Sequence, residues 1–88
     1  MQSCWITGAS SGIGRASSIA FVKKGYTVLA SSRSLNDLSL LKKECEELSY
    51  SGKIIPLPMD VTSIKEINKA LKYIKKNIKT LDYVIFNA

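Results

Sequence analysis

The 88-residue sequence contains no histidine, only two cysteines and no long hydrophobic run. Cys4 and Cys45 lack the spacing of metal ligands, and no histidine can complete a set, so we expect two buried thiols and no metal site. No segment approaches the roughly 18 apolar residues of a membrane span, and the apolar start lacks the basic leader of a secretory signal. These absences lead us to expect a cytoplasmic protein with no membrane partner.

Acidic residues are also scarce, with seven Asp and Glu against thirteen Lys and Arg, and the net charge is +6. This excess suits an anionic small ligand, a nucleic acid or an anionic membrane surface, and charge alone selects none of them. Lysines recur at helical spacing over residues 65–79 with Tyr73 as the one interleaved aromatic, a pattern typical of a solvated helix face. We therefore expect no nucleic-acid partner.

Strand-like and helix-like segments alternate along the whole chain. Short apolar or β-branched runs predict strands at 3–7, 26–30, 53–59 and 81–86. The segments between them carry apolar residues three and four apart and predict three helices. The first covers 12–24 before Gly25, and Ser34 and Ser63 open the next two with acidic residues three positions on, as in capping boxes. Their expected apolar faces are Leu38, Leu41, Cys45 and Leu48 in the second helix, and Ile64, Ile67, Leu71, Ile74 and Ile78 in the third.

The order β-α-β-α-β-α-β predicts an α/β fold with a parallel sheet, because parallel strands need long crossover connections. We expect the strand order 3-2-1-4 in one incomplete doubly wound domain over residues 1–88, with the first two helices on one face and the third on the other. Pro56 and Pro58 favour an edge position for the third strand. The fourth strand would be the other edge, with Val84, Ile85 and Phe86 uncovered, so we expect self-association into a homo-oligomer.

Three glycines separate the first strand from the first helix, in the stretch TGASSGIG. A glycine-rich turn at this point of a parallel sheet lies where backbone N–H groups and the positive end of the helix dipole converge. The spacing of Gly8, Gly12 and Gly14 is G-x-x-x-G-x-G, which differs from both G-x-G-x-x-G and the G-x-x-x-x-G-K phosphate loop. The stretch predicts an anion-binding site, and a flexible turn without a ligand is the alternative.

Thr7–Ala16, TGASSGIGRA, resembles the T-G-x-x-x-G-x-G cofactor motif of the short-chain dehydrogenases/reductases. Three later stretches resemble the family at the expected intervals: the second strand and its turn at 26–33, Met59–Thr62, and the run Leu81–Ala88 into an N-N-A-G motif. The resemblance covers essentially the whole chain and implies a Rossmann-like fold. It also implies a dinucleotide site, with the Asp near the adenine, formed by Gly8, Ser10, Ser11, Gly12, Ile13, Gly14, Asp60, Val61, Asn87 and Ala88.

The turn after the second strand bears on the choice of cofactor. In dinucleotide-binding folds a carboxylate about 20 residues beyond the glycines binds the ribose hydroxyls of NAD, whereas an Arg accommodates the 2′-phosphate of NADP. Ser32, Arg33 and Ser34 offer a guanidinium and two hydroxyls and no carboxylate. This turn predicts NADP rather than NAD, although Ser11 stands where many NADP-preferring relatives carry a basic residue, and a solvated Arg33 is the alternative.

Two features depart from the family pattern. Phe86 stands where the first Asn of N-N-A-G is usual. The resemblance implies a catalytic Ser and a catalytic Tyr-x-x-x-Lys pair, but none of the four tyrosines here has a lysine four residues later, so we assign no catalytic residue. The resemblance implies an NADP-dependent oxidoreductase that transfers hydride between nicotinamide and a small carbonyl or alcohol, of which this chain is the cofactor-binding part. A non-catalytic nucleotide-binding fragment or interaction module is the alternative. We expect the chain alone to be inactive.

Overall fold

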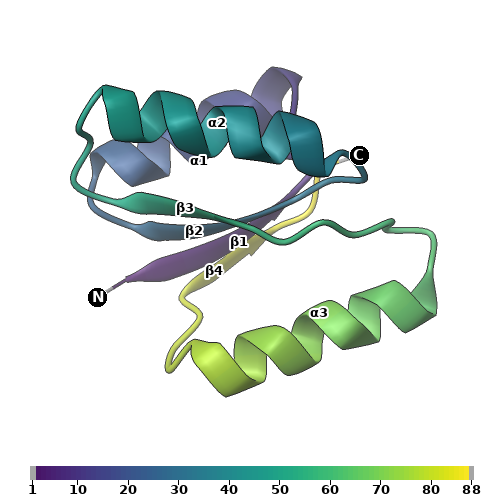
Figure 1. Ribbon diagram of the computed structural model, residues 1–88. Helices are drawn as coiled ribbons and strands as arrows, with labels where there is room; N and C mark the ends of the chain where they lie inside the picture. The colour runs from purple at the N-terminus through teal and green to yellow at the C-terminus, as the bar shows by residue number, and fades with distance from the viewer. Residues whose placement is uncertain (1, 88) are drawn as a thin grey trace.

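The computed structural model describes residues 2–87 as a four-stranded sheet with three helices (Figure 1). The elements are β1 (Ser3–Thr7), α1 (Gly12–Lys23), β2 (Thr27–Ser31), α2 (Leu35–Glu47), β3 (Lys53–Pro56), α3 (Ile64–Asn77) and β4 (Tyr83–Ile85). All neighbouring strands are parallel, and their order is β3-β2-β1-β4. The predicted α/β class and strand order are therefore confirmed.

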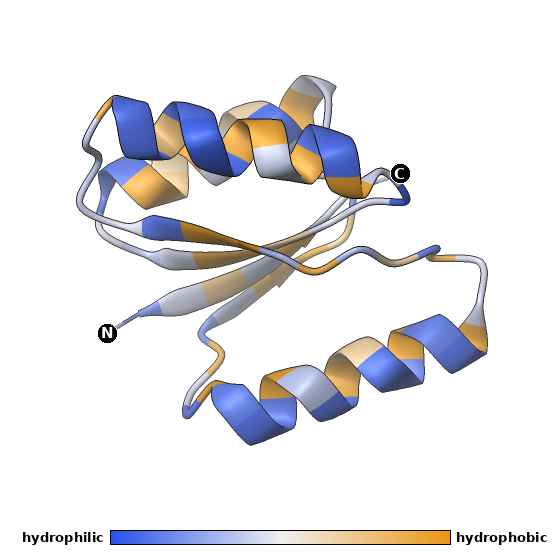
Figure 2. Cartoon of the chain, in the orientation of Figure 1, coloured by the Kyte–Doolittle hydropathy of each residue, from blue (hydrophilic) through white to orange (hydrophobic). Residues whose placement is uncertain are grey.

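The two faces of the sheet hold two separate cores. Helices α1 and α2 cover one face and α3 the other, as predicted (Figure 1). Because side chains alternate along a strand, one face contributes Cys4, Ile6, Val28, Ala30 and Ile54 to the core beneath α1 and α2. The other contributes Trp5 and Leu29, which pack with Met59, Ala70 and Ile74. Figure 2 shows the apolar side of α3 turned towards the sheet and its polar side outward.

Several element ends differ from the sequence-based predictions, and the fourth strand covers Tyr83–Ile85 rather than 81–86. Strand β3 ends at Pro56 rather than Met59, because prolines cannot donate to the sheet, although the N–H of Leu57 still donates to the carbonyl of Ala30. Leu48, predicted on the buried side of α2, follows its last helical residue and is 55% exposed. These differences lie at element ends, where periodicity carries little information.

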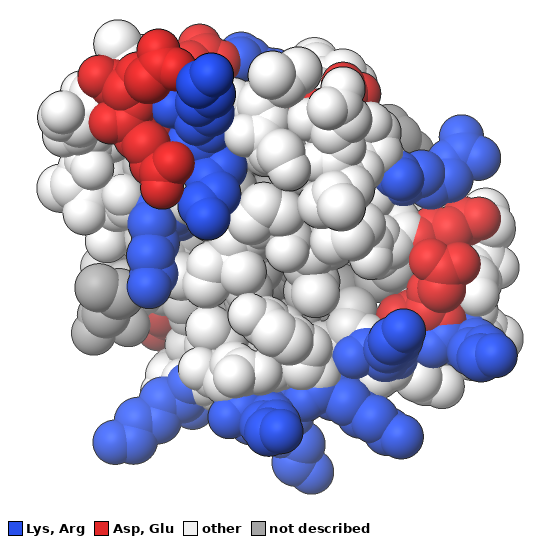
Figure 3. Space-filling model, viewed as in Figure 1, with Lys and Arg blue, Asp and Glu red and all other residues white. Residues whose placement is uncertain are grey.

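The buried side of α3 is also narrower than predicted. Ala70 and Ile74 are buried, with Ile67 and Ile78 packed partly against them, whereas Ile64 is 75% and Leu71 45% exposed. At about 100° per residue, the two exposed residues lie at the margin of the strip that touches the sheet. The lysines of α3 are exposed, and Figure 3 shows them as a blue rim along the side of the molecule that α3 occupies.

Candidate functional site

The carboxyl ends of all four strands lie at one edge of the sheet, because the strands are parallel. Hydrogen bonds join the loops that follow them. The N–H of Ala9 donates to the carbonyl of Ser31 at 3.0 Å, and the N–H of Met59 donates to that of Ser32 at 2.8 Å. The structure thus brings together the residues that the sequence predicts after β1, β2 and β3.

The three glycines of the first loop have different surroundings. Gly8 has φ +62° and Gly12 has φ +56°, a conformation that favours glycine. A Cβ on Gly8 would lie 2.4 Å from the carbonyl oxygen of Asn87, and one on Gly14 would lie 2.0 Å from that of Gly8. A Cβ on Gly12 would meet nothing within 4 Å. Two glycines therefore allow close packing, and Gly12 borders open space.

The N-terminus of α1 borders the open space beside Gly12. Its N-cap residue, Ser11, makes no side-chain hydrogen bond to the first turn, and that turn contains no acidic residue. Ser11, Gly12 and Ile13 are exposed, Ile13 to 77%, while Ser10 is half-buried. The first N–H groups of a helix have no partner within the helix and carry partial positive charge. This terminus can bind an anion.

The turn after β2 holds Arg33 at the surface between two serines. The hydroxyl of Ser32 accepts a hydrogen bond from the N–H of Ser34 at 3.2 Å. The Ser34 hydroxyl in turn accepts from the N–H of Asp37 at 3.2 Å and caps α2. Both hydroxyls thus shape the turn, and the exposed guanidinium of Arg33 is the group most available to a ligand.

Asp60 and Val61 lie in the loop between β3 and α3. The carboxylate of Asp60 accepts from the hydroxyl of Thr62 at 2.7 Å and from its N–H at 2.9 Å. These two bonds, and more weakly the charge of Arg33, lower the pKa of Asp60 from its ordinary value. Asp60 therefore stays ionised at neutral pH, and Val61 beside it is 48% exposed.

Asn87 joins the loop after β4 to the glycine-rich loop. Its N–H donates to the hydroxyl of Thr7 at 3.0 Å, and its backbone lies against Gly8. Phe86 before it is 70% exposed, with its ring 6.0 Å from that of Trp5. Asn87 thus holds two loops together, whereas Ala88, also predicted for the site, lies outside the described residues.

Sequence reasoning missed the partner of Arg15, a residue at the start of α1 to which it gave no more than a diffuse attraction. The guanidinium forms an ion pair with Glu44 on α2. Twenty-nine positions separate the two residues, and no periodic signal connects them. Arg15 is therefore engaged between the helices, which leaves Arg33 as the arginine available at this edge.

Metal and thiol chemistry receive no support from the part of the chain that the structure describes. No cluster of His, Cys, Asp or Glu within it could hold a metal ion. Cys4 and Cys45 are buried free thiols, as predicted, and burial raises the pKa of Cys4 to about 11. Among the described helices, none is long and apolar enough to cross a membrane.

The residues at this edge of the sheet fit the phosphate groups of a dinucleotide cofactor. Open space at Gly12 lies beside unpaired N–H groups of α1, which suit a pyrophosphate. Arg33, on the neighbouring loop, suits a second phosphate. A cavity of about 560 Å³ lies elsewhere, beside the amino ends of the strands, so the fit rests on the loops and helix terminus and not on a cavity.

Comparisons with known proteins agree with this geometry. The chain is 36% identical over 85 residues to 3-oxoacyl-[acyl-carrier-protein] reductase FabG of Thermotoga maritima, covering 97% of this chain and 34% of the relative. It is also 36% identical to NADP-dependent 3-hydroxy acid dehydrogenase of Schizosaccharomyces pombe, covering 94% and 32%. The chain thus spans about a third of the length of these relatives.

A solved structure and a family profile lead to the same assignment. The alcohol dehydrogenase of the archaeon Thermococcus sibiricus, complexed with 5-hydroxy-NADP, superposes with a TM-score of 0.87 at 26% identity, over 96% of this chain and 35% of that one. The profile of the short chain dehydrogenase family matches residues 2–88. On this match, which extends over nearly every residue, the chain belongs to the short chain dehydrogenase family.

Proposed function

We propose that this chain is the cofactor-binding part of an NADP-dependent oxidoreductase that transfers hydride between nicotinamide and a small carbonyl or alcohol substrate. The observation that carries the proposal is the uncapped N-terminus of α1 beside Gly12, where unpaired N–H groups and room for a ligand coincide. Such a terminus suits the pyrophosphate of a dinucleotide. Membership of the family, in which the relatives named above are reductases and dehydrogenases, supports hydride transfer as the reaction.

The preference for NADP over NAD rests on Arg33. NADP differs from NAD by a 2′-phosphate, and a guanidinium pairs with phosphate through two parallel hydrogen bonds. Arg33 is exposed and forms no ion pair within residues 2–87, and the turn around it has no carboxylate to repel a phosphate. The relative that is named NADP-dependent and the neighbour complexed with 5-hydroxy-NADP agree with this preference.

The residues of this chain would bind and orient the cofactor, which itself supplies or accepts the hydride. Gly12 and the first N–H groups of α1 would hold the pyrophosphate, and Arg33 the 2′-phosphate. The Asp60–Val61 loop would lie beside the adenine. The contact of Asn87 with Thr7 and Gly8 keeps two of these loops in fixed relative positions. No tyrosine among these 88 residues has a lysine four residues later, so the catalytic Tyr-x-x-x-Lys pair implied by the family resemblance is not among them.

A second candidate is a nucleotide-binding module without catalysis. It is the alternative that the sequence leaves open, since binding of a dinucleotide does not require an acid or base. The two candidates differ in turnover and not in binding: residues 1–88 should bind NADPH in both, and hydride transfer would require further residues. Oxidation of NADPH by a panel of carbonyl compounds, with and without a longer chain that includes such a pair, separates them.

The cofactor proposal is tested by Arg33→Ala. Charge-assisted hydrogen bonds contribute on the order of 1.5 to 3 kcal/mol, so NADPH affinity should fall roughly ten- to hundredfold while NADH affinity changes little. Cofactor fluorescence titration measures both. Lys53→Ala, at the amino end of β3, removes the same charge far from the site and should leave both affinities unchanged. Equal losses for NADPH and NADH in Arg33→Ala would contradict the proposal.

Two further proposals concern the oligomeric state and the cellular compartment of the protein. The exposed edge of β4, where Val84 is 45% exposed, supports self-association, because uncovered apolar strand edges recruit other chains. The two buried free thiols support a reducing compartment such as the cytoplasm. Light scattering on the purified chain tests the first, and a stable monomer would contradict it.

A further inference from the structure

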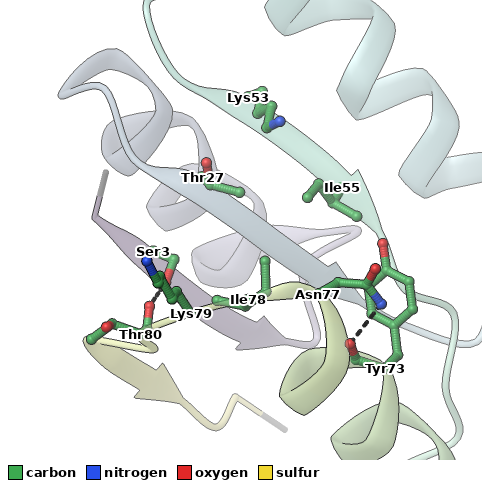
Figure 4. A pocket seen from close by; sticks show the side chains of 9 residues that line it. All are labelled: Ser3, Thr27, Lys53, Ile55, Tyr73, Asn77, Ile78, Lys79 and Thr80. Carbon is green, nitrogen blue, oxygen red and sulfur yellow. Dashed lines mark hydrogen bonds between the residues drawn. The ribbon is translucent and has the colours of Figure 1, made fainter.

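A cavity of about 560 Å³ lies at the edge of the sheet opposite the glycine-rich loop. It is bounded by the first residues of β1, β2 and β3 and by the last turn of α3 with the segment that follows it (Figure 4). Its volume is within the range of about 300 to 1,000 Å³ that is usual for small-molecule sites. The proposed cofactor site lies at the carboxyl ends of the same strands, so the two sites do not overlap.

The floor of the cavity is a polar row across the sheet. Ser3, Thr27 and Lys53 occupy paired positions on three adjacent strands and point to the α3 face. Two residues further along β1 and β2, the same face carries Trp5 and Leu29, which pack beneath α3. The face therefore changes from apolar to polar where α3 no longer covers it, and the change coincides with the cavity.

Beyond the polar row, the lining is mixed: Asn77 and Thr80 are polar, and three side chains are apolar or aromatic. Ile55 on β3, Ile78 at the end of α3 and the ring of Tyr73 line it, and Figure 4 shows them around the opening between β3 and the helix. Tyr73 is 38% exposed, and Ile55 and Ile78 are half-buried. A ligand with an apolar body would cover these side chains and remove apolar area from water, which favours binding.

The charge of the cavity has one sign. Lys53 and Lys79 are both lining residues and exposed, and no acidic residue lines the cavity within the described chain. The nearest carboxylate among the hydrogen-bond partners of the lining residues is that of Asp82, which accepts from the N–H of Ser3 at 2.9 Å. The hydroxyl of Ser3 donates to the carbonyl of Thr80, so the two lysines are the groups that suit an anionic head group.

We infer that this cavity binds a small anionic amphiphile, a carboxylate on an apolar chain of medium length. The carboxylate would lie between Lys53 and Lys79 over the polar row, and the chain would extend along Ile55 and Tyr73. No cofactor is needed for this binding, because the cavity shares no residue with the loops at the carboxyl ends of the strands.

The test uses decanoate as the probe and the isotopically labelled 88-residue chain. Chemical shifts should change at Lys53, Ile55, Tyr73 and Ile78 and saturate with decanoate, and decanol, which has the same chain without the charge, should bind at least fivefold more weakly. Lys53→Gln with Lys79→Gln should weaken decanoate binding at least fivefold. Lys72→Gln with Lys76→Gln, on the exposed side of α3, is the matched control and should have no effect.

Four outcomes would overturn the inference. Shifts confined to the apolar edge of β4, equal binding of decanoate and decanol, or equal losses in the two double variants would each show that the cavity does not select the anion. Addition of NADPH should leave decanoate bound, because the sites lie at opposite edges. Displacement by NADPH would place the probe in the cofactor site and contradict the inference without affecting the cofactor proposal.

Discussion

The N-termini of α2 and α3 differ from that of α1 in how their N–H groups are satisfied. Ser34 and Ser63 cap α2 and α3 with their hydroxyls, and each of these helices has an acidic residue in its first turn, Asp37 or Glu66. Helix α1 begins at Ser11 with an extended backbone, no side-chain cap and no acid. The same residue type therefore caps two helices and leaves the third open.

Under the proposed function, this difference marks the helix terminus where stability is given up for binding. A cap contributes about 1 kcal/mol, and a first-turn carboxylate about 0.3 to 1 kcal/mol more. Helix α1 forgoes both, and its open end adjoins the one glycine of the loop with free space around it. An anion bound there would supply the interactions that the sequence supplies to α2 and α3. The following predictions alter one terminus at a time.

The largest effect is expected from Gly12→Val. A branched side chain would occupy the space beside the N–H groups of α1, so NADPH affinity should fall at least about hundredfold, or roughly 2.7 kcal/mol. The positive φ of Gly12 adds a cost of about 1 to 2 kcal/mol to folding. Fluorescence titration measures the affinity, and circular dichroism should show most of the helix retained.

A control separates the loss of space from the loss of stability. Ala16→Val adds the same side chain at an exposed position of α1, where it lowers helix propensity only modestly. It should bind NADPH with nearly the affinity of the unmodified chain. If Gly12→Val also retained its affinity, the pyrophosphate would have to bind elsewhere, and the proposed role of the open terminus would be wrong.

The second prediction gives α1 the acid that it lacks. In Ser11→Asp, a carboxylate next to the helix N-terminus should raise the free energy of unfolding by about 0.3 to 1 kcal/mol. The same charge would repel a phosphate, and NADPH affinity should fall about tenfold. Ser11→Asn, a cap without charge, is the matched control and should lose less affinity. An unchanged affinity in Ser11→Asp would show that no anion approaches this terminus.

Sequence patterns predicted the architecture well because burial and periodicity are local signals. The strand 3–7 matches β1, and the capping boxes at Ser34 and Ser63 mark the beginnings of α2 and α3 as the structure has them. The order of strands followed from the doubly wound topology that the alternation of strands and helices predicts. The positions of Gly8, Gly12 and Gly14 identified the loop, and their surroundings separate Gly12, which borders open space, from the two that allow close packing.

The predictions failed where distant parts of the chain decide the outcome. The pairing of Arg15 with Glu44 depends on how α1 lies against α2. The exposure of Leu71 depends on how closely α3 approaches the sheet. The contacts of Asn87 with Gly8 and Thr7 depend on the register in which β4 pairs with β1. None of these three features produces a periodic pattern in the sequence.

The third prediction compares the caps directly. Ser34→Ala removes the hydroxyl that accepts from Asp37 and should lower the free energy of unfolding by about 1 kcal/mol. Ser11→Ala removes a hydroxyl that makes no capping hydrogen bond, and it should change the free energy of unfolding by less than about 0.5 kcal/mol. Urea unfolding of both variants measures the difference. Equal losses would mean that α1 is capped in solution, and the contrast between the termini would disappear.

The smallest effect concerns pH and the segment before α3. The Thr62 hydroxyl and N–H lower the pKa of Asp60 below its ordinary value of 3.8. The native state therefore favours the ionised carboxylate. The contribution to stability is present above the pKa of the unfolded chain and is lost as pH falls through the lower pKa of the folded one.

Asp60→Asn should remove this part of the acid sensitivity, so the difference in stability between the variant and the unmodified chain should shrink as the pH falls from 6 to 3. The beginning of α1, which has no carboxylate in its first turn, serves as the internal comparison. Amide exchange near Thr62 should quicken on acidification more than exchange at Ile13, after correction for the intrinsic effect of pH. If both termini loosened equally, the acid response would belong to the whole fold and not to the capped terminus of α3.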